Sequence, residues 1–400
     1  MSATSSKALL PGQNDNGQQT TLGVMGGGQL GRMFVHSAQQ MGYFTAVLDP
    51  DVSSPAGWVS HYHIETDYLD EAGLAQLMQR SVAITTEFEN VPAPALYTLG
   101  GHRTVAPSAR AVAIAQNRVK EKTHFNNCGV ACAPFQAIES AEQLKQAMEQ
   151  PQLFPAILKT SSMGYDGKGQ VGVQTPADLP QAWDSLKNVD AILEKKLPLA
   201  FECSVIVIRG FDGQMVNFPV QKNLHRDGIL AVTEVYQGAI DAAIAEKAVQ
   251  SAKAIAQGLD YVGVLCLEFF VLENGELVVN EMAPRPHNSG HYTMNACDVS
   301  QFDLQVRSLA RLPLVQPRQH SPAIMLNILG DLWLKDGTNQ AKTPAWAEVL
   351  ALPGCHLHLY GKLEARKGRK MGHLNITAAT VEQVKEVALK ACVILGIQAF

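Results

Sequence analysis

Apolar and polar positions follow two different rhythms along the chain, and the first rhythm covers residues 21–118. The stretches "LGVM", "FTAVLDP" and "SVAITTEFENV" are short apolar runs, which favour buried parallel strands. Between the first two runs, apolar and small residues recur with the spacing of one helix face, namely Leu30, Met33, Phe34, Ser37, Ala38 and Met41. Gly42 follows where a helix C-terminus favours glycine. This alternation predicts a small doubly wound α/β lobe.

The second rhythm, over residues 119–313, combines strands with tight turns. The stretches "FPAILKT", "GQVGVQT" and "AILEKKL" are expected strands, and with two interleaved helices they form a predicted lid subdomain at about 130–195. Hairpin turns are predicted at three later pairs, which are Asp212-Gly213, Asp227-Gly228 and Asn274-Gly275. Strands and helices in such runs predict an α+β domain with a mainly antiparallel sheet.

Three further segments complete the predicted architecture. Ser108 is expected to cap one helix that runs to about Asn127. A second long helix is expected over Asp241–Gly258. Residues 314–400 form a smaller predicted lobe that is rich in strands and ends in an amphipathic helix from about Thr380.

Composition limits the class of protein. A chain of 400 residues with 46% hydrophobic and 17% charged residues is typical of a globular enzyme with about two to three domains. A net charge of −5 argues against a nucleic-acid partner. The 7 cysteines are odd in number and form no C-x-x-C pair, which is typical of a reducing compartment. Residues 1–20 lack the features of a secretory signal and no run is long enough for a membrane span, so we expect a flexible leader and a cytoplasmic protein.

A glycine pattern at the start of the first lobe raises a separate hypothesis. Gly26, Gly28 and Gly31 form G-x-G-x-x-G between an apolar run and the expected helix, and Asp49 follows about 20 residues later. In a dinucleotide-binding fold, the helix start binds a pyrophosphate and the acid binds a ribose. The pattern alone therefore leaves an NAD-dependent oxidoreductase open.

Two glutamates are expected to face each other across the hairpin at Asn274-Gly275. If that turn has two residues, positions equally distant from it are paired, so Glu268 lies opposite Glu281. Their neighbours are Leu, Phe and Val, so the pair is expected to be largely buried. Like charges there are destabilising unless something compensates them. A Mg²⁺ ion that also binds substrate phosphates would do so, and a proton shared by two structural acids is the alternative.

A lysine and a glycine-rich loop form the second candidate site. Lys159 ends an apolar strand, and the stretch "SSMGYDGKGQ" that follows contains Gly164, Gly167 and Gly169. An ammonium beside backbone N–H groups suits a polyphosphate. The loop joins two strands, so it is not the phosphate loop that opens a helix, and a flexible hairpin with exposed lysines is the alternative.

Between these two sites, two glutamates and a histidine are further candidates. Glu194 stands at a strand end and Glu202 in the next strand, where an edge backbone could bind an adenine and a carboxylate the ribose hydroxyls. Ordinary solvation at the surface is the alternative for each glutamate. His225 lies beside a tight turn, where a lone histidine is more often structural.

The order of these features resembles the ATP-grasp superfamily. A lysine precedes a glycine-rich hairpin, a glutamate at a hinge strand follows, and paired acids come last in "LEFF…NEMAPR". More narrowly, the chain is similar to the 5-(carboxyamino)imidazole ribonucleotide synthase family in "GGGQLGRM", "TTEFENVP", "GYDGKGQ", "NLHRDGIL", "NEMAPRPHNSGH" and "GRKMGHLN". The resemblance spans about residues 22–375. It implies an ATP-grasp fold with a Rossmann-like first lobe and a small C-terminal β-rich lobe.

The resemblance also implies an activity. The family joins bicarbonate to the exocyclic amine of 5-aminoimidazole ribonucleotide through carboxyphosphate, converts ATP to ADP and phosphate, and serves de novo purine synthesis. Mg²⁺ or Mn²⁺ is the implied cofactor, and a homodimer is the implied assembly. A formate-using ribonucleotide transformylase of the same superfamily remains as the rival.

In this family ATP binds between the two later lobes, so the dinucleotide pattern would be a decoy. The segment Gly26–Gly31 would then face the ribonucleotide, with helix N–H groups favouring its phosphate. Asp49 would be structural.

Individual roles follow from the same resemblance. The implied ATP-binding residues are Arg118, Lys159, Gly164, Tyr165, Asp166, Gly167, Lys168, Gly169, Gln170, Glu194, Lys195, Lys196, Leu197, Glu202, His225, Asn280 and Glu281. The implied metal ligands are Glu268 and Glu281. The implied catalytic residues are Asp166, Lys168, Lys370 and Arg285. The implied substrate-binding residues are Gly28, Gln29, Leu30, Glu87, Asn90, His287, Asn288, Ser289, Arg366 and Arg369.

Two positions depart from the commoner pattern. The family often has arginine where Lys168 stands, and a point charge replaces a two-pronged donor there. Many ATP-grasp enzymes carry asparagine where Ala283 stands, which leaves a second metal ion less well held.

Overall fold

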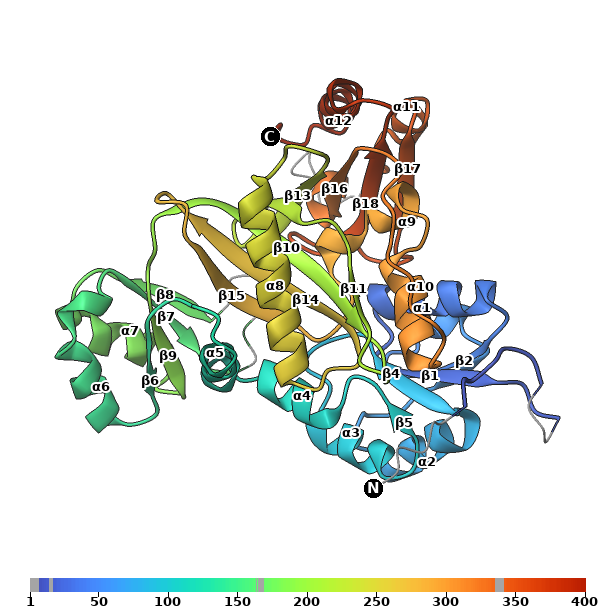
Figure 1. The fold of residues 1–400 in the computed structure, drawn as a ribbon, viewed down its shortest axis with the longest axis horizontal. Coiled ribbons are helices and arrows are strands. Elements are labelled where there is room, and N and C mark those ends of the chain that lie inside the picture. Colours follow the sequence, from blue (N-terminus) through green and yellow to red (C-terminus); the bar gives the residue numbers. More distant parts are fainter. Residues whose placement is uncertain (1–6, 14–16, 163, 165–168, 335–341) are drawn as a thin grey trace.

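The computed structural model describes residues 7–13, 17–162, 164, 169–334 and 342–400. Within these ranges the strands form three sheets, which lie side by side along the long axis of the molecule (Figure 1). No helix in these ranges is both long and apolar enough to span a bilayer.

The first sheet is parallel and has the strand order β3-β2-β1-β4-β5. Its strands are β1 (Thr21–Met25), β2 (Phe44–Leu48), β3 (Tyr62–Ile64), β4 (Ala83–Thr86) and β5 (Thr104–Val105). Its helices are α1 (Gln29–Gln40), α2 (Glu71–Arg80), α3 (Ala93–Gly100) and α4 (Ala109–Ala115). Leu22 and Val24 of β1 pack with α1, whereas Met25 packs on the side of α2 and α3. Helices therefore cover both faces, and the predicted doubly wound lobe is confirmed.

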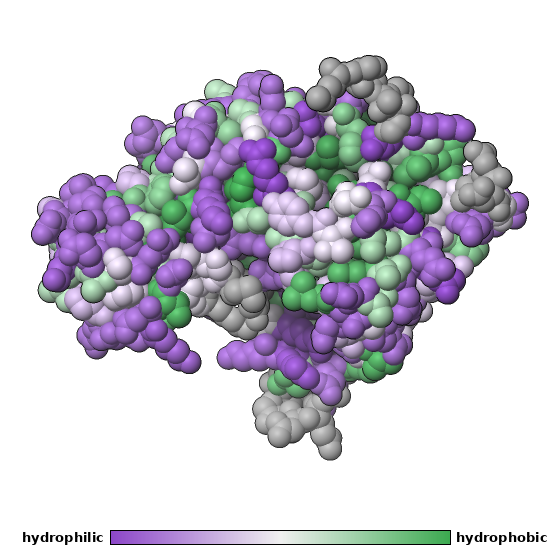
Figure 2. Space-filling model, turned by 90° about the horizontal axis from the view of Figure 1, so that it is seen from below, coloured by the Kyte–Doolittle hydropathy of each residue, from purple (hydrophilic) through white to green (hydrophobic). Residues whose placement is uncertain are grey.

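The second sheet is small and antiparallel, with the order β6-β9-β7-β8, and lies at the left end of Figure 1. Its strands are β6 (Phe135–Ile138), β7 (Ala156–Thr160), β8 (Gln170–Val173) and β9 (Ala191–Lys195). Helices α6 (Ala141–Met148) and α7 (Leu179–Ser185) contribute to the core that these strands bury. Seen from below, its outer surface is mostly hydrophilic, and the molecule is hollowed between this lobe and the rest (Figure 2).

The third sheet is the largest and has the order β15-β14-β10-β12-β13-β16-β18-β17, with β11 beside β10. Its strands are β10 (Leu199–Arg209), β11 (Met215–Asn217), β12 (Gln221–Arg226), β13 (Ile229–Val235), β14 (Gly263–Leu272), β15 (Leu277–Ala283), β16 (Ala323–Leu329), β17 (Cys355–Leu359) and β18 (Lys370–Thr377). Helices α8 (Ala242–Gly258) and α10 (Gln301–Leu309) cover opposite faces, because Val205 and Val207 pack with the first and Ile206 and Ile208 with the second.

The C-terminal strands continue this sheet. β13 pairs antiparallel with β16, so the predicted C-terminal lobe does not form a sheet of its own. The remaining helices are α9 (Thr293–Ala296), α11 (Trp346–Leu350) and α12 (Val381–Leu395). Thr380 caps α12 through a hydrogen bond from Gln383 N–H, as predicted.

One predicted helix is wrong in a way that matters for the site. The helix that begins after Ser108 ends at Ala115, and α5 (Arg118–Asn127) begins anew after Asn117. Asn117 has extended backbone angles, and its side chain accepts hydrogen bonds from the N–H groups of Val119 and Lys120. Asparagine competes in this way with the helical pattern and starts a second helix. α5 lies between the small sheet and β15 (Figure 1).

Candidate active site

A cavity of about 320 Å³ lies where the three sheets meet. The predicted ATP-binding residues that line it are Arg118, Lys159, Gly164, Gln170, Glu202, His225, Asn280 and Glu281. The predicted metal, substrate and catalytic residues that line it are Glu268, Asn90, His287, Asn288, Arg285 and Lys370. Tyr165, Asp166, Gly167 and Lys168 lie outside the described residues. The structure therefore brings together residues that are up to 280 positions apart in the sequence, from Asn90 to Lys370.

The paired glutamates do face each other, although the hairpin differs from the prediction. Val271 pairs with Leu277 and Leu272 N–H donates to the carbonyl of Glu276 (2.8 Å), so the loop has three residues where two were predicted. The register then shifts between Glu268 and Phe269, and Glu268 again pairs with Glu281. The extra residue is Asn280, a β-bulge that restores the register and turns this side chain to the cavity.

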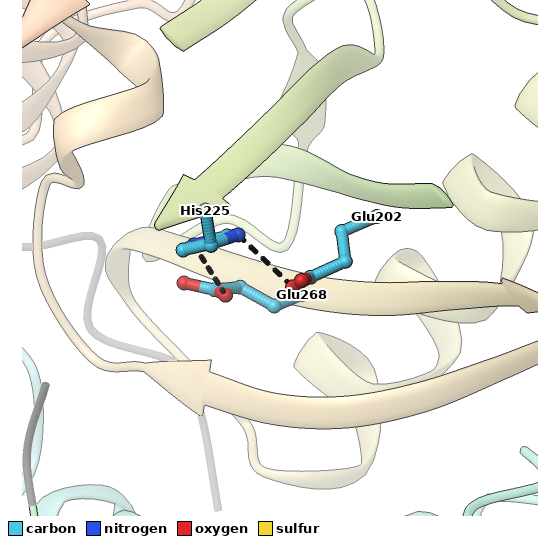
Figure 3. A group of neighbouring side chains, drawn as sticks. All are labelled: Glu202, His225 and Glu268. Carbon is cyan, nitrogen blue, oxygen red and sulfur yellow. Dashed lines mark ion pairs between the residues drawn. The ribbon is translucent and has the colours of Figure 1, made fainter. Parts of the chain in front are cut away.

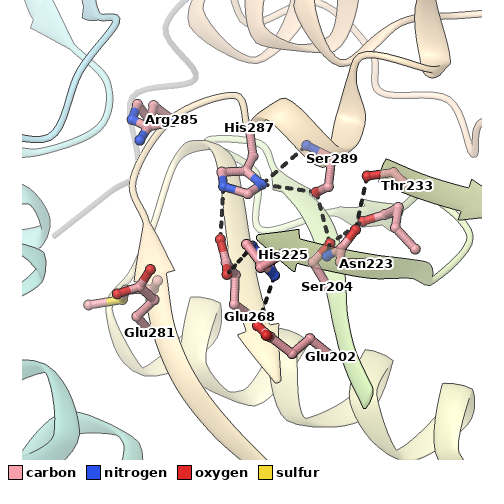
Figure 4. Close-up of polar contacts among 12 residues, drawn as sticks. Glu202, Ser204, Asn223, His225, Thr233, Glu268, Glu281, Arg285, His287 and Ser289 are labelled. Carbon is pink, nitrogen blue, oxygen red and sulfur yellow. Dashed lines mark hydrogen bonds and ion pairs between the residues drawn. The ribbon is translucent and has the colours of Figure 1, made fainter. Parts of the chain in front are cut away.

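Each of the two glutamates has its own nitrogen partner, and Figure 4 shows that of Glu268. Glu268 Oε1 lies 2.8 Å from His287 Nε2, whereas Glu281 Oε2 lies 3.1 Å from an Arg118 nitrogen. Burial alone would raise the pKa of Glu268, but His287 and His225 lower it to about 2. The side chain of Glu281 is 40% exposed, so the expectation that both acids are largely buried is wrong for Glu281. These two partners supply compensation beyond the metal ion and the shared proton that the sequence suggested.

A second group of possible ligands lies on neighbouring strands of the central sheet (Figure 3). Glu202, His225 and Glu268 each offer one atom, and the three atoms lie within 4.8 Å of one another. His225 Nδ1 is 3.0 Å from Glu202 Oε2, and its Nε2 is 4.0 Å from Glu268 Oε2. An imidazole suits Zn²⁺ or Mn²⁺, whereas Mg²⁺ prefers oxygen ligands. Glu268 and Glu281, which are paired in register and offer only oxygen ligands, therefore fit Mg²⁺ better than this group does.

His287 is held by a chain of buried hydroxyl groups. Its Nδ1 lies 2.9 Å from Ser289 Oγ and accepts the N–H of Ser289 at 3.3 Å. Ser289 Oγ is in turn 2.8 Å from Ser204 Oγ, which also accepts a hydrogen bond from Asn223. Because Nδ1 accepts the N–H of Ser289, Nε2 carries a hydrogen and donates a hydrogen bond to Glu268. Ser289 is fully buried, so its predicted contact with a substrate becomes a supporting contact.

Glu194 does not point its carboxylate at the cavity as an adenine contact would. It is 3% exposed, and its Oε2 accepts a hydrogen bond from Lys159 Nζ (2.9 Å) and lies 3.3 Å from Lys122 Nζ. The N–H groups of Lys195 and Lys196 donate to Pro134 and Pro155. Base recognition by this segment would therefore use carbonyl groups or the exposed strand beyond Lys196.

Sequence reasoning missed two buried residues of α5. Lys122 is 1% exposed and also donates to the carbonyl of Asn280 (3.1 Å). Glu121 accepts the N–H of Met282 (2.6 Å), and burial followed by the charge of Glu281 raises its pKa to about 8. The signal was available, since Arg118, Glu121 and Lys122 are spaced three and four residues apart and share one helix face.

The glycine-rich turn of the first lobe is already filled by carboxylates. The N–H of Gly27 donates to Asp49 Oδ2 (2.6 Å), and those of Gly28 and Gly31 donate to Glu87 (3.0 and 3.2 Å). β1 and β4 are adjacent parallel strands, so Glu87 occupies the crevice where a doubly wound fold binds its ligand. The expectation that these N–H groups bind a phosphate is wrong, whereas the structural role of Asp49 is confirmed.

Other predicted substrate residues divide clearly. The side chain of Leu30 packs in a buried cluster with Met33 and Phe302, so it contributes to the core. Arg366 is exposed and pairs with Glu364, and Arg369 donates to the carbonyl of Glu364. Among the residues that the structure describes, neither arginine lines the cavity. Gln29 remains a prediction.

Arg285 is buried against an acid of the first lobe. Its Nε donates to Glu89 Oε2, and a second nitrogen donates to the carbonyl of Pro286 (3.0 Å). Burial alone would raise the pKa of Glu89, but Arg285 lowers it to about 2. The ion pair therefore joins the first lobe to the central sheet at the cavity wall, beside Lys370.

The lysine on a small antiparallel sheet, the facing acids on a hairpin and the cavity between them define an ATP-grasp enzyme. Residues 123–302 match the ATP-grasp domain family, and residues 19–116 match the ribonucleotide synthetase preATP-grasp domain. Residues 323–387 match the phosphoribosylaminoimidazole carboxylase C-terminal domain. The N5-carboxyaminoimidazole ribonucleotide synthase of Bacillus subtilis (strain 168) is 40% identical over 353 residues, which cover 88% of this chain and 90% of that protein. The chain therefore belongs to the N5-carboxyaminoimidazole ribonucleotide synthase family.

Solved structures agree with this assignment. The N5-carboxyaminoimidazole synthetase of Staphylococcus aureus, complexed with ADP, has a TM-score of 0.85 and 36% identity, and the match covers 96% of this chain and 100% of that chain. The Aspergillus clavatus enzyme in complex with ADP and 5-aminoimidazole ribonucleotide has a TM-score of 0.84 and 30% identity, with 94% and 98% covered. The family is that of an ATP-grasp ligase, so a dehydrogenase is excluded.

Proposed function

We propose that this chain carboxylates 5-aminoimidazole ribonucleotide with bicarbonate, at the expense of ATP, and releases ADP and phosphate. Family membership supports the reaction, and the match of residues 323–387 to the carboxylase C-terminal domain favours it over the formate-using transformylase. One observation of the site carries the proposal: facing acids and phosphate-binding cations line one cavity together with Arg285 and Lys370. We further propose a homodimer, which light scattering would test.

The ATP half of the cavity would lie between the small sheet and the β14–β15 hairpin. Lys159 and Arg118 would bind the phosphates, and Glu202 the ribose hydroxyls. Ile157, Leu199 and Phe270 supply apolar surface for the base. Mg²⁺, when bound by Glu268 and Glu281, would neutralise phosphate charge during transfer to bicarbonate. His287 Nε2 donates a hydrogen bond to Glu268, so in this arrangement His287 orients that acid.

The second half of the reaction requires a dry site. Phosphorylated bicarbonate is short-lived in water, so the carboxyl group must be transferred to the amine before solvent enters. Arg285 and Lys370 are fixed cations at the wall where bicarbonate and the departing phosphate would lie. Asp166 and Lys168, which lie outside the described residues, are proposed to act on the same substrates.

Phosphate release in the presence of ATP and Mg²⁺ tests the proposal. We expect release only when both bicarbonate and 5-aminoimidazole ribonucleotide are present, with the carboxylated product formed in equal amount. A matched reaction with formate in a bicarbonate-depleted buffer is the control. Equal turnover with formate would favour the transformylase and overturn the proposal.

A further inference from the structure

Lys122 occupies an unusual place, because it joins two sheets while remaining inside the protein. It lies on α5, and its ammonium contacts Glu194 Oε2 on β9 (3.3 Å) and the carbonyl of Asn280 on β15 (3.1 Å). Helix α5 lies between these sheets (Figure 1). The side chain is 1% exposed and is not among the described residues that line the cavity, so Lys122 itself does not reach a nucleotide.

The same glutamate also binds the lysine that is predicted to contact ATP. Lys159 Nζ donates to Glu194 Oε2 at 2.9 Å, and both ammonium groups therefore share one carboxylate oxygen. Lys159 lines the cavity, unlike Lys122. Binding a phosphate with Lys159 must weaken its pair with Glu194, since one ammonium then serves two anions.

Because Glu194 is buried, weakening its pair with Lys159 costs free energy unless the carboxylate keeps another cation. Glu194 is 3% exposed, and among the described residues its Oε1 has no hydrogen-bond partner. A buried carboxylate that loses its last cation is strongly destabilised. Burial raises the pKa of Glu194, but Lys122 and then Lys159 lower it below its ordinary value. Both lysines therefore keep this acid ionised, and Lys122 does so from outside the cavity.

We propose that Lys122 is a positioning residue that holds the charge of Glu194, and so leaves Lys159 able to bind the nucleotide phosphates. The inference rests on the proposed function only in taking an adenine nucleotide as the ligand. Two ammonium groups on one acid leave one positive charge in excess, and only Lys159 can present it to the cavity. The contact with Asn280 fixes the distance between the sheets, because it satisfies a carbonyl at the bulge.

Calorimetric titration with MgADP and with adenosine tests this role without any substrate of the ligase reaction. We expect Lys122→Met to weaken ADP binding by about a hundredfold, because Lys159 is then the last cation of a buried acid. Adenosine has no phosphate, so its affinity should not change. Lys120→Met is the matched control, since Lys120 is an exposed lysine of the same helix.

The double variant Lys122→Met/Glu194→Gln gives the decisive readout. Removing the acid as well frees Lys159, so ADP affinity should recover most of the loss, which a merely structural role of Lys122 would not predict. If Lys122→Met is too unstable to titrate, Lys122→Gln, which keeps a donor for the Asn280 carbonyl, takes its place.

The outcomes separate the inference from the proposed function. Wild-type affinity for ADP in Lys122→Met, or no recovery in the double variant, would overturn the role of Lys122 while the ligase activity could still stand. An equal loss of adenosine binding would also overturn it, because the defect would then not involve the phosphates. A wild-type chain that binds neither ligand would instead remove the ATP site itself.

Discussion

The first turns of α1 and α5 are both helix starts with charged partners, yet only one of them serves the cavity. At α1, the N–H groups of Gly27, Gly28 and Gly31 already donate to Asp49 and Glu87, so the polar groups satisfy one another. At α5, Arg118 lines the cavity and binds Glu281 of β15. The N–H groups at the start of α1 are already bonded within the first lobe, whereas the guanidinium at the start of α5 lines the cavity and is available to a ligand.

The difference shows that a glycine motif reports a backbone shape and not its occupant. The G-x-G-x-x-G turn of this chain has the geometry of a dinucleotide site, but an acid from the next parallel strand fills it. Function follows from the polar groups that remain available. The predictions below test this distinction between closed and available polar groups, from the largest expected effect to the smallest.

Replacing Glu268 by Gln should have the largest effect on activity. The change removes a proposed Mg²⁺ ligand and the acid that orients His287, so we expect turnover to fall by about a thousandfold, beyond the tenfold to hundredfold typical of losing an outer partner. Melting temperature should also fall, because a pKa of about 2 shows that the ionised form is stabilised in the fold. Repulsion from Glu281 alone would have predicted the reverse.

Steady-state turnover and thermal unfolding, measured on the same preparation, check both parts. Glu273→Gln is the control, since Glu273 is an exposed acid in the loop of the same hairpin. Near-normal turnover in Glu268→Gln would contradict the metal assignment.

Asp49→Ala should separate stability from nucleotide binding. Asp49 accepts hydrogen bonds from Gly27 N–H, Tyr68 Oη and Asp51 N–H, and it is buried. Losing them should lower the free energy of unfolding by about 2–4 kcal/mol. Because these groups belong to the closed turn, the affinity for ADP should not change, and NAD should not bind to either form.

Urea unfolding and titration with ADP and NAD measure the three quantities. Asp51→Ala removes an exposed neighbouring acid and is the control. Micromolar binding of NAD to the wild-type chain would contradict the interpretation of the glycine turn.

Some features of this site could be predicted from the sequence and others could not. The difference is how far apart the contacting residues lie along the chain. The hairpins, α1 and the facing of Glu268 and Glu281 follow from local spacing, although the last was right through two compensating errors, a longer loop and a bulge at Asn280. The break at Asn117 was missed because no glycine or proline marks it in the sequence. Lys122 was missed because its partners, Glu194 and Asn280, lie 72 and 158 residues further on. Its spacing from Arg118 marks a shared helix face, but local spacing does not identify partners so far along the chain.

Ser289→Ala should cause a smaller loss that appears in turnover. Ser289 Oγ links His287 Nδ1 to Ser204, so its removal leaves the imidazole free to rotate away from Glu268. We expect kcat to fall by about tenfold at most, because Ser289 acts on the proposed metal ligand Glu268 only through His287, while the affinity for ADP changes little. Ser308→Ala is the control, because this buried serine bonds only within its own helix turn in the described structure. An unchanged kcat would show that the hydroxyl chain does not orient His287.

The smallest effect is expected in a cluster of stacked histidines, which are not among the described residues that line the cavity. The rings of His291 and His358 both stack on the ring of His373, with centroid distances of 4.4 and 4.6 Å. Burial, and then His356, lowers the pKa of His358 to about 4, and burial also lowers the pKa of His291 and His373. The pKa of this histidine in the unfolded chain is 6.5, so below that pH protons bind the unfolded chain and not the folded one. The stability that comes from the neutral ring is therefore complete above pH 6.5 and is lost as the pH falls towards 4.

Replacing His358 by Gln should therefore reduce the loss of unfolding free energy between pH 7 and 5.5 by about 1 kcal/mol, without changing ADP affinity at pH 7. Urea unfolding at both pH values measures it, with exposed His102→Gln as the control. An unaltered pH dependence would mean that His358 is already protonated in the folded chain at pH 5.5, and would contradict the prediction.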